Sequence, residues 1–329
     1  MIIEKVSFPT GQHCETTTLG ALLHHAGLAL SEPMLFGLGE GLGFVYWDAK
    51  NLDFPFLGGR TKPFTITRTA AAHLGLTLHV QETTSPRKAW QSATTALASG
   101  LPVGLQLDSY HLDYFTTKVH FGGHFAALYG YDDTHAHLID TAQQGSTVKT
   151  TRTSLEQARN ERGPMTARNL SYTIAAPTTQ PDLGHAIRTA IHNNARTFLT
   201  PPIANLGHRG IDKAAHQVTR WLNRSTTPSH DLPLAATLME RGGTGGSLFR
   251  AMYRDFLAEC STILNDDNIR LAHHLYTEIA PLWTEVAHHI STAGETDDPA
   301  HLTHASALLT DLAERERHAM RILIGDHTA

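Results

Sequence analysis

The chain has 329 residues, of which 41% are hydrophobic and 17% charged, and its net charge is −5. These values are typical of a globular protein, allow about two domains, and argue against nucleic acid or an anionic membrane as partner. The sequence contains no apolar run of about 18 residues, and its N-terminus lacks the pattern of a signal peptide. Its two cysteines, Cys14 and Cys260, are too far apart in sequence to suggest a disulfide framework. We therefore expect a cytoplasmic protein.

The first half of the chain mixes predicted strands and helices. Hydrophobic periodicity and turn residues predict strands at 2–8, 76–82, 102–108, 125–131, 137–140 and 170–175, and helices at 14–27, 64–75, 86–99 and 154–159. The glycine-rich stretch at 37–43 is expected to be a loop that walls the active site, because its spacing does not match a phosphate-binding motif. The pattern predicts an α+β domain over residues 1–178.

The second half reads as helices only. Segments with a period of 3.6 residues, separated by proline, glycine and aspartate breakers, predict helices at 182–199, 208–223, 231–241, 246–264, 268–292 and 300–323. The proline-flanked stretch at 177–181 is the expected boundary. The sequence thus predicts an all-α domain over residues 179–329.

Cys14 stands at the start of the predicted helix at 14–27, where unpaired N–H groups and the helix dipole favour a thiolate. A nucleophilic thiolate needs a base and a group that orients the base. His124 opens one predicted strand and Asp140 closes the next, so the two side chains could face each other at the open end of a hairpin. We therefore predict Cys14, His124 and Asp140 as catalytic residues.

These residues also have structural interpretations. Cysteine is among the most buried residue types, and Cys260, inside an apolar helix, fits that description better than Cys14, which has polar neighbours. A histidine at a strand edge, such as His124, is a weak signal without its acidic partner. Close to the thiol, Gln12, His13 and the backbone N–H of Cys14 are predicted to support an oxyanion.

A second polar cluster lies between the predicted strands at 102–108 and 125–131 and consists of Asp108, Tyr110, Tyr114 and His120. Carboxylates bind an ammonium group and tyrosines can wall it, so this cluster is a predicted substrate-amine site; the alternative is an ordinary polar loop. Glu15 and Glu40 complete the predicted substrate-binding residues of this half. No metal site is predicted, because the glycines between His120 and His124 break any helix that would align them.

In the helical half, a glycine-rich turn at 242–246 leads into a helix that carries Arg250 and Arg254 one turn apart. A helix N-terminus with arginines can bind an anion, which predicts an anionic substrate group at the domain interface. The alternative is a helix junction with two surface arginines.

Several of these motifs resemble the butirosin-biosynthesis protein H family. The resemblance rests on His13-Cys14-Glu15-Thr16-Thr17, the glycine-rich stretch at 36–42, Gly123-His124-Phe125 and Asp140-Thr141. In the second half, Gly245-Gly246-Ser247-Leu248-Phe249-Arg250 resembles the helical domain of unknown function that commonly follows this family's first domain.

The resemblance implies a papain-like or transglutaminase-like fold and acyl transfer from an acyl carrier protein to an amine through a cysteine thioester. Carried over to this chain, Cys14 takes the acyl group, His124 is base and then acid, and Asp140 orients His124. No cofactor is implied beyond an acyl or amino-group carrier protein that delivers the substrate; a small partner subunit or a second copy of the chain would be further partners.

Three alternatives remain open. The first is ring closure or elimination on a carrier-bound amino acid, which would form an aziridine or azabicycle with loss of an anion such as sulfate, with the arginines more important than the thiol. The second is a non-catalytic scaffold, and the third is a peptidase.

Overall fold

The computed structural model describes residues 1–8, 11–49, 52, 54–163, 165, 168–176 and 179–326. It divides into two compact units, Met1–Leu35 with Pro63–Asp182 (unit 1) and Phe36–Lys62 with Leu183–Ala329 (unit 2). The predicted α+β class, an antiparallel sheet followed by a helical region, is confirmed. The predicted boundary after residue 178 stays a prediction, because residues 177 and 178 lie outside the described residues.

Unit 1 contains a six-stranded antiparallel sheet in the order β3-β8-β4-β5-β6-β7. The strands are β3 (Leu78–Gln81), β4 (Val103–Leu107), β5 (His124–Tyr131), β6 (His135–Ile139), β7 (Thr147–Thr151) and β8 (Ser171–Ile174). The helices are α1 (Cys14–His25), α3 (Thr65–His73), α4 (Pro86–Ala98) and α5 (Arg152–Asn160), with 3₁₀ turns η1 (Ser109–His111) and η2 (Ala142–Gln144).

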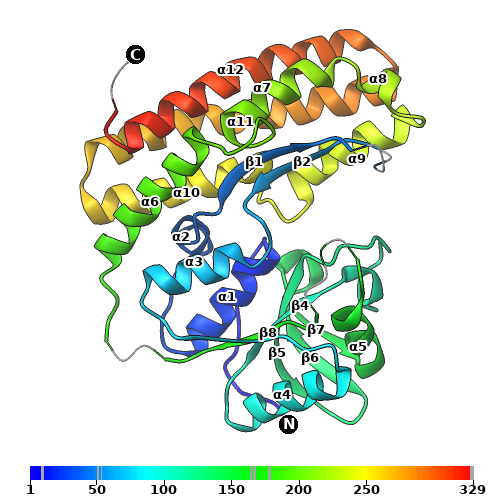
Figure 1. Ribbon diagram of the computed structural model, residues 1–329, viewed down its shortest axis with the longest axis vertical. Helices are drawn as coiled ribbons and strands as arrows, with labels where there is room; N and C mark the ends of the chain where they lie inside the picture. The colour runs from blue at the N-terminus through cyan, green and yellow to red at the C-terminus, as the bar shows by residue number, and fades with distance from the viewer. Residues whose placement is uncertain are drawn as a thin grey trace. The chain divides into compact units, whose positions relative to one another are not determined.

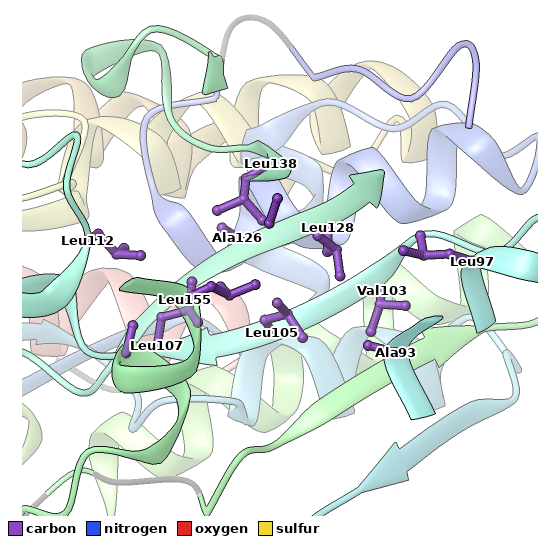
Figure 2. Packing of buried hydrophobic residues seen from close by; sticks show 12 residues of the cluster. Ala93, Leu97, Val103, Leu105, Leu107, Leu112, Ala126, Leu128, Leu138 and Leu155 are labelled. Carbon is purple, nitrogen blue, oxygen red and sulfur yellow. The ribbon is translucent and has the colours of Figure 1, made fainter. Parts of the chain in front are cut away.

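The two faces of this sheet are covered by different helices. Leu105 in β4 and Ala126 in β5 are paired and fully buried, and their face packs on α4 and α5 (Figure 2). Phe125 points to the other face, since side chains alternate along a strand. There it stacks on Phe64, whose backbone N–H donates to Glu15 of α1. α1 therefore covers the face opposite to α4 and α5.

Two features of unit 1 differ from the sequence prediction. Residues 2–8 form no strand; Ile2 makes a single bridge to Gly130 in β5. β7 was not predicted, because its Thr-Val-Lys-Thr-Thr sequence is polar and its residues are largely exposed at the edge of the sheet.

Unit 2 combines a hairpin with the helical region. The hairpin strands are β1 (Leu42–Trp47) and β2 (Phe56–Arg60). The helices after unit 1 are α6 (Leu183–Leu199), α7 (Gly207–Val218), α8 (Trp221–Arg224), α9 (Pro228–Arg241), α10 (Arg250–Leu264), α11 (Asp267–Thr296) and α12 (Pro299–Leu323), with the 3₁₀ turn η3 (Ser247–Phe249) before α10 (Figure 1). Within the described residues, none of the helices has both the length and the apolar character needed to cross a membrane.

The glycine-rich stretch at 37–43 was expected to be a loop throughout, but only residues 39–41 lie outside a helix or strand. It spans the end of α2 (Glu32–Leu38) and the start of β1. A Cβ atom on Gly37 would lie 2.2 Å from the Phe256 ring, so the glycine permits close packing on α10. Phe36, next to it, stacks on Phe249 at 5.3 Å. Gly37 therefore serves the packing of unit 2.

Candidate active site around Cys14

Cys14 is the first residue of α1, and a buried carboxylate fixes the turn that precedes it. Glu32 accepts hydrogen bonds from the backbone N–H of Gln12 (2.8 Å), the backbone N–H of His13 (2.9 Å) and the Thr16 hydroxyl (2.8 Å). Burial raises the pKa of Glu32 although these hydrogen bonds oppose the rise. No local sequence pattern predicts this role for Glu32, because its partners lie about 20 residues earlier in the chain.

The contacts of Glu32 affect which of the predicted hydrogen-bond donors can stabilise an oxyanion. The backbone N–H groups of Gln12 and His13 already donate to Glu32, and the His13 ring lies 3.2 Å from the Thr16 hydroxyl. The Gln12 side chain is exposed, whereas His13 is buried. The backbone N–H of Cys14 belongs to the first turn of α1, where N–H groups have no acceptor within the helix. Of the predicted donors, that N–H fits the role best.

The structure brings His124 and Asp140 together. His124 begins β5, Asp140 follows β6, and their side chains meet with His124 Nε2 2.7 Å from Asp140 Oδ2. Both side chains are buried, with 8% and 0% exposed. The second carboxylate oxygen of Asp140 accepts from the backbone N–H of Thr141 at 2.6 Å. The carboxylate is thus fixed from both sides and holds the imidazole in one orientation.

The same imidazole interacts with the thiol of Cys14. Burial alone would lower the pKa of His124, but the negative charges of Asp140 and Cys14, and hydrogen bonds to both, raise it to about 10. Cys14 Sγ also lies 4.0 Å from the carbonyl oxygen of Gly123, the residue before His124. Because Nε2 is bound to Asp140, Nδ1 is the ring nitrogen that can exchange a proton with the thiol. The arrangement can deprotonate a thiol and return the proton to a leaving group.

Tyr114 was predicted to contact substrate, but the structure gives it a different position. Its hydroxyl donates to Asp140 Oδ2 at 2.6 Å. Burial, followed by the charge of Asp140, raises the pKa of Tyr114 well above its usual value, so the hydroxyl stays a donor. Phe115, the next residue, contacts the His124 ring edge-on at 5.1 Å. The segment 114–115 therefore positions the His124–Asp140 pair.

The two predicted substrate-binding glutamates also make internal contacts. Glu15 is fully buried and accepts from the backbone N–H groups of Phe64 (3.1 Å) and Thr67 (3.0 Å) at the start of α3, so it has no exposed atom for substrate. Glu40 belongs to unit 2, where Asn193 Nδ2 donates to its carboxylate at 3.0 Å. The prediction for Glu15 is thus corrected to a helix-capping role.

The predicted amine site at Asp108 is likewise organised from within. Asp108 accepts from the backbone N–H groups of Tyr110 (2.9 Å) and Phe121 (3.2 Å), and its other oxygen lies 3.2 Å from His120 Nδ1. The rings of Tyr110 and His120 stack at 4.0 Å. Both carboxylate oxygens are therefore occupied by the loop that Asp108 organises, and it does not offer a free charge to an ammonium group.

The predicted anion site in the helical half is not supported. Arg250 is fully buried and forms a two-point ion pair with Glu316, at 2.9 and 3.0 Å. Arg254 is partly exposed and pairs with its neighbour Asp255. The backbone N–H of Ser247, in the glycine-rich turn, donates to Glu240. Carboxylates of the protein therefore already hold the groups that were expected to bind an anion.

Two family models match parts of the chain. Residues 13–141 match the family model described as "Butirosin biosynthesis protein H, N-terminal". Residues 153–323 match "Domain of unknown function (DUF4872)". Cys14, His124 and Asp140 all fall within the first match. No curated protein matches the chain.

Among solved structures, a C39-like peptidase from Bacillus anthracis is similar, with 18% sequence identity and a TM-score of 0.38. The match covers 54% of this chain and 98% of that one, and such a score does not assign a fold by itself. The two family models together span the site and the helical region. The chain therefore belongs to the family of the domain of unknown function DUF4872, and its residues 13–141 match the N-terminal domain of butirosin biosynthesis protein H.

Proposed function

We propose that the chain is an acyltransferase of antibiotic biosynthesis that moves an acyl group from a carrier-protein thioester to an amine through a thioester on Cys14. The observation that carries this proposal is the buried 2.7 Å contact between His124 Nε2 and Asp140 Oδ2, which leaves the other ring nitrogen for the thiol at the start of α1. The match of residues 13–141 to the N-terminal domain of butirosin biosynthesis protein H supports antibiotic biosynthesis as the setting.

The proposed reaction has two half-reactions that balance. First, the Cys14 sulfur gives its proton to His124 and attacks the donor carbonyl; the new C–S bond forms as the carrier's C–S bond breaks, and the carrier thiol leaves with the proton from His124. Second, an amine attacks the Cys14 thioester, the Cys14 sulfur leaves, and His124 takes the proton that the nitrogen loses. The backbone N–H of Cys14 stabilises the oxyanion in both.

Two of the alternatives lose support. The ring-closing alternative depended on an arginine-lined anion site, and Arg250 is instead buried against Glu316. Loss of activity in an Arg250→Ala variant would report misfolding and would not discriminate the mechanisms. A scaffold that only binds partners does not need a buried, braced His124–Asp140 pair next to a thiol, because such burial costs stability.

The proposal is tested by trapping the acyl-enzyme. The purified chain is mixed with acetyl, butyryl and aminobutyryl thioesters of N-acetylcysteamine, which mimic the carrier's thiol arm, and analysed by intact-protein mass spectrometry. We expect the wild type and Cys260→Ala to gain one acyl mass and Cys14→Ala to gain none. Cys260 is a matched control because it is a buried thiol whose pKa burial raises.

Two results would contradict the proposal. One is the absence of an adduct on the wild type with all three thioesters. The other is an equal adduct on Cys14→Ala, which would place the reactive group elsewhere.

A further inference from the structure

A group of potential metal ligands lies in unit 1 outside the Cys14 site. His111, His120 and Glu161 each offer one ligand atom, and these three atoms lie within 4.8 Å of one another. His111 ends the 3₁₀ turn η1, His120 lies in the following loop, and Glu161 follows α5. Because Glu161 is 41 or more residues away in sequence, no local motif could have revealed the group.

The tautomer of His120 is suited to metal binding. Its Nδ1 lies 3.2 Å from Asp108 Oδ2, and since a carboxylate only accepts, Nδ1 carries the proton and Nε2 carries the lone pair. Metal-binding histidines usually donate their other N–H to a carboxylate in this way. Asp108 is itself buried and held by two backbone N–H groups, and Tyr110 stacks on the His120 ring. His120 is thus oriented before any ion binds.

The other two ligands are in mutual contact. His111 Nε2 lies 2.5 Å from Glu161 Oε2, so an ion bound by both groups would take the place of this contact. The side chains of His111, His120 and Glu161 are 19%, 57% and 32% exposed. The contact between His111 and Glu161 therefore has room to open to the spacing of about 3.3 Å that tetrahedral bonds of about 2.0–2.1 Å require, and His120 has room to adjust with it.

A cavity of about 350 Å³ adjoins the group and is lined by Asp108, His120, Glu161 and Arg162 among others. Catalytic zinc sites have three protein ligands and leave the fourth coordination position to water or substrate. Here the cavity gives access to that fourth position.

From this geometry we propose that His111, His120 and Glu161 bind one divalent transition-metal ion of the Zn²⁺ class, with Asp108 orienting His120 and the fourth position open to the cavity. Two imidazole nitrogens and one carboxylate are donors that Zn²⁺ accepts, whereas Mg²⁺ and Ca²⁺ prefer oxygen. The ion would fix both ends of the segment from His111 to His120. This segment carries Tyr114 and Phe115, which contact Asp140 and His124.

The experiment needs no substrate, so it can fail independently of the proposed acyl transfer. The chain is stripped with a chelator and titrated with Zn²⁺ by calorimetry, and with Co²⁺ by visible absorption. We expect one tight site per chain and the intense absorption bands of four-coordinate Co²⁺. Calorimetry in two buffers of different ionisation enthalpy should show proton release on binding. The ion should also raise the thermal midpoint of unfolding.

Single substitutions test which residues bind the ion. His120→Gln and Glu161→Gln should weaken binding at least 100-fold, and Asp108→Asn should weaken it 10- to 100-fold while one site per chain remains. The two ligand side chains are partly exposed, so the stripped variants should unfold at the same temperature as the stripped wild type. His301→Gln is the matched control, because His301 lies in a histidine cluster with His289 and His304 in the helical unit.

The proposal is overturned by any of three results. One is the absence of a tight site in the wild type. Another is a tight site that His120→Gln and Glu161→Gln leave unchanged. The third is a tight site that disappears in His301→Gln or in Cys14→Ser, which would place the ion among the helices or at the thiol.

Discussion

At the scale of single residues, the site depends on how Asp140 is held. Its Oδ2 atom meets both His124 Nε2 and the Tyr114 hydroxyl, and its Oδ1 atom meets the backbone N–H of Thr141. A carboxylate fixed in this way keeps the imidazole in one tautomer and stabilises its positive charge. The two predicted catalytic residues His124 and Asp140 therefore share a hydrogen-bond network with Tyr114, which was predicted to bind substrate.

Tyr114→Phe tests that reassignment. Losing the hydrogen bond to Asp140 should lower the free energy of unfolding by about 1–2 kcal/mol. It should also slow acylation of Cys14 by an N-acetylcysteamine thioester about tenfold, because Asp140 then holds His124 less firmly. Tyr110→Phe is the control, since Tyr110 is 39% exposed and its ring stacks on His120, whereas the Asp140 carboxylate contacts Tyr114, His124 and Thr141. If Tyr114→Phe and Tyr110→Phe are acylated at equal rates, Tyr114 does not position the His124–Asp140 pair.

His124 gives the stability of the protein a defined pH dependence. The pKa of His124 is about 10 in the folded protein and about 6.5 in an unfolded chain, so the folded state binds this proton more tightly. Its contribution is complete below pH 6.5 and is lost as the pH rises towards 10. Urea unfolding of the wild type and His124→Gln at intervals from pH 6 to 10 should show their difference in stability shrinking by about 2–4 kcal/mol. A difference that is constant or grows over this range would contradict the assignment.

At the scale of elements, the start of α1 depends on Glu32 in α2. Its carboxylate accepts the two backbone N–H groups that precede Cys14 and the Thr16 hydroxyl. This contact explains how a thiol can be held at a helix start without a side-chain cap from the preceding residue. It also ties the first helix to α2, which was not among the predicted helices.

Glu32→Ala should leave these buried donors without a partner and lower the free energy of unfolding by about 2–4 kcal/mol. Glu156→Ala removes an exposed side chain of α5 and should change the free energy of unfolding by less than about 0.5 kcal/mol. Chemical denaturation of both variants measures the two values. Similar values for the two would mean that the turn before Cys14 does not need the buried carboxylate.

Sequence patterns predicted most elements of both halves, because α4 and the long helices each bury one apolar stripe, and β4 and β5 are short, largely buried apolar runs. They failed for β1 and α2, where glycines pack against aromatic rings, and for β7, a polar edge strand. At the site, Cys14, His124 and Asp140 could be proposed because each lies at the end of a predicted element. Glu32 and Tyr114 could not, since their roles come from contacts between segments whose register no local pattern records.

At the scale of the whole molecule, chain order and spatial grouping differ. Residues 36–62 lie early in the sequence but group with the helical region, where Phe44 of β1 packs on Trp283 of α11 at 5.5 Å. Glu316 lies in the same core and accepts from Trp283 Nε1 as well as from Arg250. The residue predicted to bind an anion is therefore part of the core of unit 2.

Arg250→Met should lower the free energy of unfolding by about 3–5 kcal/mol, because it leaves the carboxylate of Glu316 buried and unpaired. Arg254→Met, whose partner Asp255 is half exposed, should change it by no more than about 1 kcal/mol. Thermal and urea unfolding of the two variants provide the comparison. A mild effect of Arg250→Met would indicate that its charge is solvated and would reopen the anion-site hypothesis.

The central claim is that the His124 imidazole and the Asp140 carboxylate activate the sulfur of Cys14. The most direct test is the rate at which Cys14 is alkylated. Iodoacetamide labelling at pH 7, followed by peptide mass spectrometry, compares the wild type with His124→Gln and Asp140→Asn and uses Cys260 as an internal reference. We predict that labelling of Cys14 falls at least tenfold in His124→Gln, and by a smaller factor in Asp140→Asn, while labelling of Cys260 stays slow and unchanged. Equal labelling of Cys14 in all three proteins would contradict the account.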